Sequence, residues 1–371
     1  MIVIVALDKF KGSLTTFEAN EIVEKGIKEY FPSASVLCFP MADGGDGFSD
    51  VMRHYLQTKM VFVPTVNALQ QPILSHYEWD NKNYIAIIEV AKASGMQQLA
   101  KQNRNPLYTN TYGTGLLIKH AINNGAKKII LGLGGSATND GGIGILAALG
   151  YKFLDKDGNL LVPIGKHLRA IKQINQSKLY APNIEIELAC DVDNILFGNQ
   201  GAAYMYAGQK GASENDIKVL DEGLRNLSSV LSKYCGADFS ATQGCGAAGG
   251  IPLGIQSFFN AKIVKGINLI INHSGILHYA SKADLFITGE GKIDNQSLHG
   301  KVISSIANIA NSNGKSCIAY CGINTVNESF QKQFNNIFAI KNDTISEQYS
   351  IDNASNLLLE LVEKTIKNIK R

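Results

Sequence analysis

Apolar residues recur along the chain with two periods, and the two periods alternate over most of its length. Residues 2–7 form a continuous apolar run, typical of a buried strand, and residues 19–30 carry apolar side chains every three or four positions, typical of a helix. Thr15 and Glu18 have the capping-box spacing that begins a helix. A second apolar run follows at 35–40, so the N-terminal segment predicts a β-α-β unit.

From residue 60 to residue 90 the pattern changes to short runs rich in β-branched and aromatic residues. The runs at 60–66, 73–79 and 84–90 are separated by turns of Asn, Gln, Pro or Asp, which predicts antiparallel strands. The α/β pattern then returns. We expect helices at 115–123, 143–149 and 216–234, and strands at 128–133 and 184–190.

The C-terminal part alternates in the same way. It predicts a helix at 263–271, a strand at 284–288, a helix at 301–311, a strand at 315–320 and a terminal helix. Because α/β patterns at both ends enclose a different middle, we expect a doubly wound domain of residues 1–60 and 260–371, interrupted by an inserted α/β domain of residues 61–259. The length of 371 residues exceeds the roughly 250–300 at which a single core stops growing, which also favours two domains.

Composition and charge exclude several classes of protein. With 45% hydrophobic and 18% charged residues, the chain has the composition of a globular protein. The net charge of +3 comes from scattered Lys and Arg residues, which argues against a nucleic-acid partner. No run approaches the roughly 18 apolar residues that cross a bilayer, so we expect no membrane partner. The 6 cysteines form no Cys-x-x-Cys pair, and we expect free thiols in a reducing cytoplasm.

Glycine and polar residues gather where the predicted strands end. Ligands of parallel α/β sheets bind beyond the carboxyl ends of the strands, so these segments are the candidates for the site. They are residues 8–13, 43–47, 132–142, 191–194 (followed by glycines at 201, 208 and 211) and 289–301.

The first two segments combine charge with chain flexibility. Lys9 and Lys11 precede the N-terminus of a predicted helix, where anions bind favourably. Asp43 and Asp46 stand among glycines, and such carboxylates can hold Mg²⁺ or a substrate hydroxyl. A solvated loop and a tight turn before a helix are the alternative interpretations of the two segments.

The third segment, residues 132–142, leads from a strand into an apolar helix. Its backbone N–H groups, its hydroxyls and the helix dipole could converge on a phosphate or carboxylate group. Residues 132–137 also match the dinucleotide fingerprint G-x-G-x-x-A, with Asp155 following at a suitable distance. However, the helix is delayed until Ile143, and a similar pattern recurs at 244–249. A nicotinamide cofactor therefore stays an alternative.

The last two segments carry acids and a long polar run. Asp191 and Asp193 follow a predicted strand, where one carboxylate could accept the proton of a substrate hydroxyl while the other holds Mg²⁺. Two surface acids without a function are the alternative. Residues 289–301 are almost all polar or glycine after a buried strand, which is typical of a ligand-binding loop.

In this order, the segments resemble the motifs of the glycerate kinase family: a lysine-rich first loop, A-D-G-G-x-G, G-G-S-A-T-N-D-G-G, D-V-x-N and G-E-G-x-x-D-x-Q-S. They stand here at 8–14, 42–47, 134–142, 191–194 and 289–297, so the resemblance spans essentially the whole chain. It implies phosphorylation of D-glycerate with ATP and Mg²⁺ by a two-domain α/β protein, one domain flavodoxin-like, with the active site between the domains. Members often have Pro after D-V-x-N, where this chain has Ile195.

On this basis we assign roles to the candidate residues. Asp191 is the expected group that positions and deprotonates the hydroxyl, with Asp193 second, and Asp43 and Asp46 are the candidate metal ligands. The expected binding residues for phosphate, carboxylate or substrate are Lys9, Lys11, Ser13, Gly134, Gly135, Ser136, Thr138, Asn139, Lys210, Glu290, Lys292, Asp294, Ser297 and His299.

Two other functions stay open at this point. One is an NAD(P)-dependent oxidoreductase of a hydroxy acid, and the other is a sensor that binds a sugar acid or nucleotide without turnover. The sequence also leaves open whether the 2- or the 3-hydroxyl is phosphorylated, and whether the protein is a monomer or a small homo-oligomer.

Overall fold

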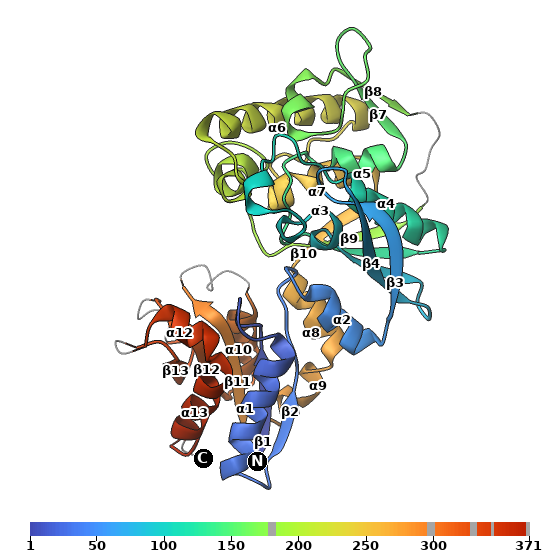
Figure 1. Ribbon diagram of the computed structural model, residues 1–371. Coiled ribbons are helices and arrows are strands. Elements are labelled where there is room, and N and C mark those ends of the chain that lie inside the picture. Colours follow the sequence, from blue (N-terminus) through green and yellow to red (C-terminus); the bar gives the residue numbers. More distant parts are fainter. Residues whose placement is uncertain (177–182, 295–300, 327–331, 343–344, 369–371) are drawn as a thin grey trace. The chain divides into compact units, whose positions relative to one another are not determined.

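The computed structural model describes residues 1–176, 183–294, 301–326, 332–342 and 345–368. The chain divides into two compact units (Figure 1), which we describe separately. The terminal unit contains Met1–Asp43 and Ile267–Arg371, and the central unit contains Gly44–Gly266. Within the described residues, none of the helices has the length and apolar character needed to cross a membrane.

The terminal unit is built on a sheet of five parallel strands in the order β13-β12-β11-β1-β2. Counted along the chain within this unit, the spatial order is 2-1-3-4-5, the order of flavodoxin-like folds. The predicted doubly wound, flavodoxin-like architecture is therefore confirmed. The strands are β1 (Ile2–Leu7), β2 (Ser35–Cys38), β11 (Leu285–Ile293), β12 (Ser316–Asn324) and β13 (Asn336–Ala339).

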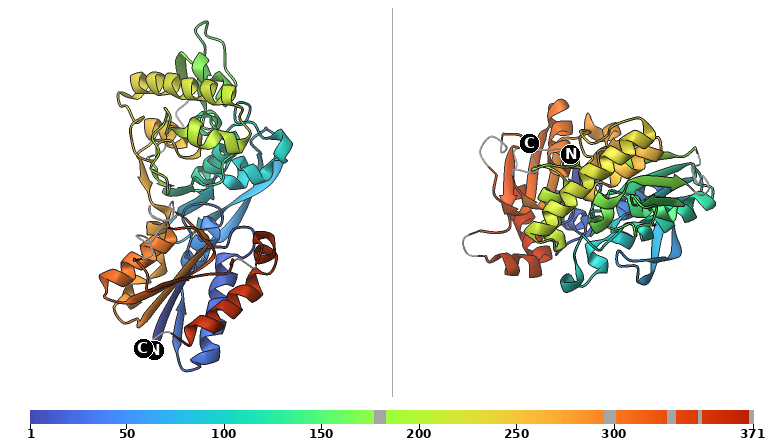
Figure 2. Two further views of the ribbon diagram at one scale, coloured as in Figure 1. Left: turned by 90° about the vertical axis from the view of Figure 1, so that its left-hand side faces the viewer. Right: turned by 90° about the horizontal axis from the view of Figure 1, so that it is seen from above.

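Helices cover both faces of this sheet. Figure 2 shows α1 and α13 on one face and α10 on the other. Alternate residues of β1, such as Val3 and Val5, pack with Val23 of α1 and Val362 of α13 in one hydrophobic core. The helices are α1 (Thr16–Tyr30), α9 (Leu277–Ala280), α10 (Val302–Ser312), α12 (Glu347–Asp352) and α13 (Ala354–Ile366), and α8 (Gly266–Ser274) begins at the unit boundary.

The start of α1 follows the predicted capping box. The Thr15 hydroxyl accepts a hydrogen bond from the Glu18 amide at 3.2 Å, and the Thr15 amide donates to Oε2 of Glu18 at 2.8 Å. Two of the amides that a helix N-terminus leaves without a partner are thereby satisfied. This local prediction is confirmed.

The central unit contains a six-stranded mixed sheet in the order β10-β9-β6-β5-β4-β3. The strands β3, β4 and β5 pair antiparallel, as their short alternating runs predicted, whereas β5, β6, β9 and β10 pair in parallel. The strands are β3 (Lys59–Val66), β4 (Pro72–Asp80), β5 (Ile85–Glu89), β6 (Lys128–Gly132), β9 (Glu185–Ala189) and β10 (Ala261–Val264). A separate hairpin consists of β7 (Tyr151–Leu154) and β8 (Gln173–Gln176).

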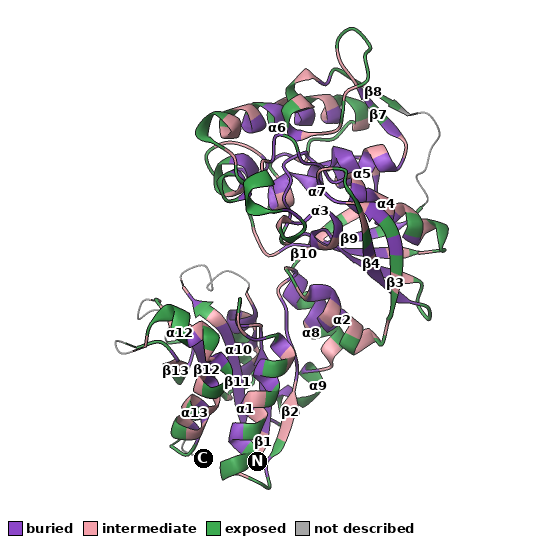
Figure 3. Cartoon of the chain, viewed as in Figure 1, coloured by how far each residue is buried: buried purple, intermediate pink, exposed green. Residues whose placement is uncertain are grey.

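Helices pack against this second sheet, and residues of the sheet and the helices together form one large hydrophobic core. Figure 3 shows the buried strands inside each unit and exposed residues on the outer faces of the helices. The helices are α2 (Phe48–Leu56), α3 (Ala91–Ser94), α4 (Tyr112–Asn123), α5 (Ile143–Ala148), α6 (Glu214–Cys235) and α7 (Ile251–Phe258). Short helical turns occur at 96–98, 101–103, 165–170, 203–210 and 247–249.

Several predicted elements differ in extent from the structure. The strand expected at 315–320, for example, continues to Asn324. The helix expected from residue 263 begins at Gly266, because Ala261–Val264 form β10 and pair in parallel with β9. The strand expected to end at residue 288 continues to Ile293, because its partner β12 extends to Asn324 and pairs with it over the whole length. Residues 289–293 of the expected loop 289–301 are therefore strand.

The division into units also differs from the expected boundaries near residues 60 and 260. The compact units separate between Asp43 and Gly44 and between Gly266 and Ile267. The earlier N-terminal boundary has a physical cause, since α2 packs on β4 and β5 of the central unit. The terminal unit is formed by the two ends of the chain.

Candidate active site

The parallel strands of the central sheet end together at one edge. The register aligns Glu89 of β5 with Gly132 of β6, Gly132 with Ala189 of β9, and Ala189 with Val264 of β10. The segments that follow these strands therefore begin side by side at this edge of the sheet. The segments that follow β6 and β9 are two of the predicted ones, residues 132–142 and 191–194.

The segment after Asp43 joins the same edge through its glycines. The Gly134 amide donates to the Gly44 carbonyl at 3.4 Å, and a Cβ added to Gly134 would lie 2.4 Å from Cα of Gly45. A Cβ added to Gly44, whose φ is +88°, would lie 2.7 Å from Oδ2 of Asp191. Only glycine allows this packing. Three of the segments singled out in the sequence thus meet within the central unit.

Asp191 is fixed by a backbone donor and partly exposed. Its Oδ1 accepts a hydrogen bond from the Gly266 amide at 3.1 Å, beyond the end of β10. Its other oxygen, Oδ2, faces Gly44. A carboxylate held in one orientation at the carboxyl edge of a sheet is suited to accept a proton from a bound hydroxyl.

The two other predicted acids of this unit are exposed. Asp193 follows Asp191 on the surface. Asp46 is also exposed, and its Oδ2 accepts a hydrogen bond from the Gln97 side chain at 3.1 Å. Both are therefore accessible to a ligand or ion.

Backbone contacts anchor the glycine-rich loop 134–142 to residues 94–96. The Met96 amide donates to the Gly135 carbonyl at 3.0 Å, and the Ala137 amide donates to the Ser94 carbonyl at 2.9 Å. Gly135 is exposed and has a φ of +73°, whereas the residues from Ser136 to Asp140 are buried. The surface that this loop offers to a ligand is therefore mainly the backbone of Gly134 and Gly135.

Lys210 holds this loop from inside the protein. Its ammonium group donates to the Ser136 hydroxyl at 2.8 Å and to the Thr138 carbonyl at 2.7 Å, and the residue is only 3% exposed. Burial lowers the pKa of Lys210 to about 7, although the Asp140 carboxylate opposes the shift. Lys210 was expected to bind substrate, but its head group contacts the protein's own loop.

Asp140 supports the other end of the loop. Its carboxylate accepts hydrogen bonds from the Thr111 amide and hydroxyl, both at 2.8 Å, and from the amides of Gly142 and Gly144. Burial raises the pKa of Asp140, while these hydrogen bonds oppose the shift. The group ties the start of α5 to the start of α4.

Two expected phosphate-binding side chains are turned away from solvent. Thr138 and Asn139 are fully buried. Within the part of the chain that the structure describes, the Thr138 hydroxyl and both polar atoms of the Asn139 amide have no hydrogen-bond partner. Such groups are costly to bury, and they do not line the exposed surface of the loop.

Glu89 lies at the same edge of the sheet and was not among the predicted site residues. Its carboxylate is buried at the end of β5, in register with Gly132, and Oε1 accepts from the Ser49 amide at 2.6 Å. Burial raises its pKa. The available signal was a single acid near the end of the apolar run 84–90.

In the terminal unit, two more predicted segments meet where β1 and β11 lie side by side. The Asp8 amide donates to the Gly289 carbonyl at 2.9 Å, and a Cβ added to Gly291 would lie 2.9 Å from the Lys11 amide nitrogen. In the flavodoxin strand order, this is the switch point at which ligands bind. The backbone geometry thus supports the choice of both segments.

The charged groups of this edge are close together. Burial raises the pKa of Asp8 well above its ordinary value, and the nearby Asp43 and Glu290 carboxylates add to this shift while Lys9 opposes it. Lys301 lies 3.9 Å from Oε2 of Glu290. Asp8 was not among the predicted site residues, although it stands in the first segment.

The remaining candidates of the terminal unit have separate surroundings. Lys292 is exposed and lies 3.9 Å from an oxygen of Asp294. The Ser13 hydroxyl donates to the Phe10 carbonyl at 3.0 Å, so it closes the turn before α1. Ser297 and His299 lie outside the described residues. Over the residues described, no group of three or more His, Cys, Asp or Glu is placed to hold a metal ion.

Comparison with known proteins decides the family. The sequence model that describes the glycerate kinase family matches residues 3–370 of this chain. The chain belongs to this family. The resemblance seen in the segments of the sequence is thereby confirmed over nearly the entire length.

Individual members of the glycerate kinase family agree with this. The chain is 37% identical over 375 residues to the glycerate kinase of Bacillus cereus. This alignment covers 100% of this chain and 97% of the relative. The chain is also 37% identical over 325 residues to the glycerate 2-kinase of Escherichia coli, covering 87% of this chain and 85% of the relative. A solved structure from Salmonella typhimurium LT2, described as a candidate glycerate kinase 2, has a TM-score of 0.84, 34% identity and coverage of 99% and 98%.

Proposed function

We propose that this protein transfers the γ-phosphoryl group of ATP to a hydroxyl of D-glycerate. The observation that carries the proposal is the meeting of Gly44, Gly134 and Asp191 at the carboxyl edge of the central sheet, in a chain that belongs to the glycerate kinase family. Phosphoryl transfer needs positioning and charge stabilisation more than a covalent nucleophile. Glycine backbones beside a fixed carboxylate supply both.

Asp191 is the group that we assign to the acceptor hydroxyl. The Gly266 amide fixes one of its oxygens, so the carboxylate can orient the hydroxyl and accept its proton as the new P–O bond forms. Asp193 is the second candidate because it is exposed two residues further along the same segment.

Gly135 and the lysines are assigned to the anionic groups of the substrates. Gly135 has no side chain to keep a phosphate or carboxylate away from the exposed backbone of the loop. Lys9, Lys11 and Lys292 of the terminal unit would pair with negative charge on ATP or glycerate. Ser136 and Lys210 act indirectly in this proposal, since their contact holds the loop.

Magnesium fits the residues as an ion shared with ATP. Mg²⁺ commonly uses one or two protein carboxylates together with water and phosphate oxygens. The exposed Asp46 and the partly exposed Asp43 supply such oxygens, whereas no described group of three ligands would form an all-protein site. We propose Asp46 as the first ligand and Asp43 as the second candidate. When bound, the ion neutralises charge on the transferring phosphoryl group.

We further propose that the 2-hydroxyl is the acceptor. The relative from Escherichia coli is named a glycerate 2-kinase, and it covers most of this chain. The nicotinamide alternative has less support, because α5 begins only at Ile143 and not directly after the second glycine of the fingerprint.

A coupled assay of ADP formation tests the proposed function. We expect ADP only when D-glycerate, ATP and Mg²⁺ are all present. Turnover of glycerate with NAD and without ATP would support the oxidoreductase, and tight binding of glycerate and ATP without ADP formation would support the sensor. Either result would overturn the proposal.

A further inference from the structure

A recess lies within the terminal unit and does not include the residues assigned to the acceptor hydroxyl. It has a volume of about 230 Å³. Its walls come from the turn after β1, from the ends of β11 and β12, and from α12 and the start of α13. It therefore lies at the carboxyl edge of the five-stranded sheet, on the side where ligands of this strand order bind.

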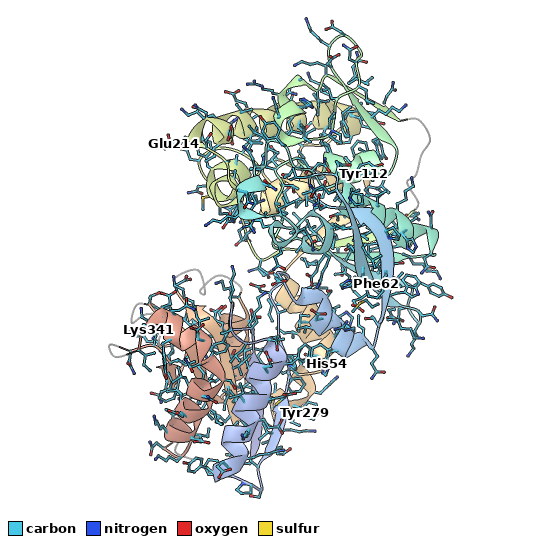
Figure 4. The ribbon with its side chains drawn as sticks, in the orientation of Figure 1. His54, Phe62, Tyr112, Glu214, Tyr279 and Lys341 are labelled. Atoms are coloured by element: carbon cyan, nitrogen blue, oxygen red, sulfur yellow. The ribbon has the colours of Figure 1, made fainter. Side chains whose placement is uncertain are left out.

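The floor of this recess is held by backbone contacts. The Ile340 amide donates to the Cys321 carbonyl, and the Lys341 amide donates to the Gly322 carbonyl, both at 2.9 Å. A Cβ added to Gly322 would lie 2.5 Å from the Gly291 carbonyl oxygen. Lys341, labelled in Figure 4, marks this end of the sheet. The recess is thus preformed by the fold.

The inner walls are apolar. Phe10, Ile340 and Ala354 are buried, and Ile323 and Ile351 are partly buried. The polar groups of the walls are largely used within the protein. The Ser350 hydroxyl donates to the Glu347 carbonyl at 2.7 Å, and Ser13 has its own backbone acceptor.

The lining also includes three exposed charged residues, namely two cations and the acid Glu347 of α12. Lys11 and Lys292 are both exposed residues of the wall. Apolar walls combined with two ammonium groups, which outnumber the single carboxylate of Glu347, match a ligand with an apolar body and an anionic tail. Glycerate, a three-carbon hydroxy acid, has no apolar body to fill such a recess. A purine nucleotide has both parts.

We propose that this recess receives the adenosine part of ATP, with Lys11 and Lys292 pairing with its phosphate chain. The volume is below the roughly 300–1,000 Å³ of pockets that enclose a whole drug-sized ligand, so it suits the base while the phosphates stay outside. The inference rests on the proposed use of ATP, and it assigns the nucleotide to particular residues of the terminal unit.

Equilibrium binding of ATP, adenosine and inorganic triphosphate, measured by titration calorimetry, tests the proposal. Ile351→Trp fills the recess from a partly exposed wall position. We expect it to raise the Kd of ATP and of adenosine about tenfold or more, with little change for triphosphate. Ile22→Trp is the matched control, because Ile22 is a partly buried residue of α1 that does not line the recess.

Lys292→Ala tests the contact with the phosphate chain instead of the contact with adenosine. Lys292 is exposed, so the substitution does not alter the buried core. We expect it to weaken ATP and triphosphate but not adenosine. Unchanged Kd values for ATP in folded Ile351→Trp would overturn the proposal. If that variant does not fold, an unchanged Kd for ATP in Lys292→Ala would do so.

These measurements involve no turnover and therefore separate the two proposals. If wild-type protein binds ATP in this recess but forms no ADP with glycerate, the proposed function fails and the nucleotide site stands. If ADP forms but the variants bind ATP as wild type does, the nucleotide lies elsewhere and the proposed function stands.

Discussion

Gly44 lies directly against the carboxylate of Asp191: a Cβ added to Gly44 would lie 2.7 Å from Oδ2 of Asp191, closer than real Cβ atoms come to oxygen. The backbone of Gly44 also has a φ of +88°, which side chains disfavour. The proposed catalytic carboxylate can therefore keep its position only because residue 44, in another segment of the central unit, is a glycine.

This relationship predicts the effect of Gly44→Ala. The methyl group must displace the Asp191 carboxylate, and small errors in positioning can cost on the order of 10²-fold in rate. We expect kcat to fall by about that factor. Steady-state kinetics with D-glycerate and ATP measures it.

Gly158→Ala is the matched control for backbone strain. Gly158 has a φ of +82°, but a Cβ there would meet nothing within 4 Å. Both variants carry the strain of a left-handed alanine, of roughly 1–2 kcal/mol, and only Gly44→Ala has the clash. Equal loss of activity in both would contradict the role assigned to Gly44.

A second prediction concerns the proton acceptor. Asp191→Asn retains the oxygen that accepts from the Gly266 amide but cannot take a proton. We expect kcat to fall by roughly 10²–10⁴, the usual range for losing a general acid or base, with little change in Tm. Asp157→Asn, an exposed acid of a turn, serves as the control. If Asp191→Asn keeps kcat within about twofold of wild type, Asp191 only closes a turn.

The third prediction uses the buried Lys210. Its pKa of about 7 in the folded protein lies below the ordinary value of about 10.4, so between these values the unfolded chain binds more protons than the folded one. Lys210 should therefore make the protein more stable as pH rises through this window, by up to about 1.4 kcal/mol per pH unit.

Lys210→Met removes this dependence. We expect the free energy of unfolding, measured in denaturant at several pH values from 7 to 10, to rise more with pH in wild type than in the variant. The comparison cancels the titration of buried cysteines and tyrosines, which is common to both proteins. Parallel pH profiles would show that Lys210 keeps its charge at neutral pH in the folded protein.

The fourth prediction concerns the divalent ion. Chelation with EDTA should abolish ADP formation, and added Mg²⁺ should restore it. In Asp46→Asn we expect a higher Mg²⁺ concentration for half-maximal rate, because one anionic oxygen ligand is lost. Full activity in EDTA, or an unchanged Mg²⁺ requirement in Asp46→Asn, would remove Asp46 from the metal site.

The sequence predicted the elements that are long and strongly periodic. The apolar run of β1 and the capped α1 were found within a residue or two, because local periodicity and a capping box fix them. β10 was missed, since three apolar residues that are interrupted by Lys262 and lead into a helix do not reveal which period they follow. The end of β11 was missed because its polar residues are held in a strand by pairing with β12.

The site could be predicted only as far as chain order and strand ends allow. The rule that ligands bind at carboxyl ends of parallel strands selected the segments of Gly44, Gly134 and Asp191, which the structure brings together. The directions of Thr138, Asn139 and Lys210 could not be predicted. In a glycine-rich loop the backbone has no fixed period, so sequence spacing does not tell which side chains face solvent.

The central claim is that ATP phosphorylates D-glycerate on this protein, and ³¹P NMR of the reaction mixture tests it most directly. We expect the γ-phosphate signal of ATP to decrease in step with the appearance of ADP and of a phosphomonoester coupled to the C2 proton of glycerate. If ATP persists, or if only inorganic phosphate appears while glycerate remains unmodified, the protein is not a glycerate kinase.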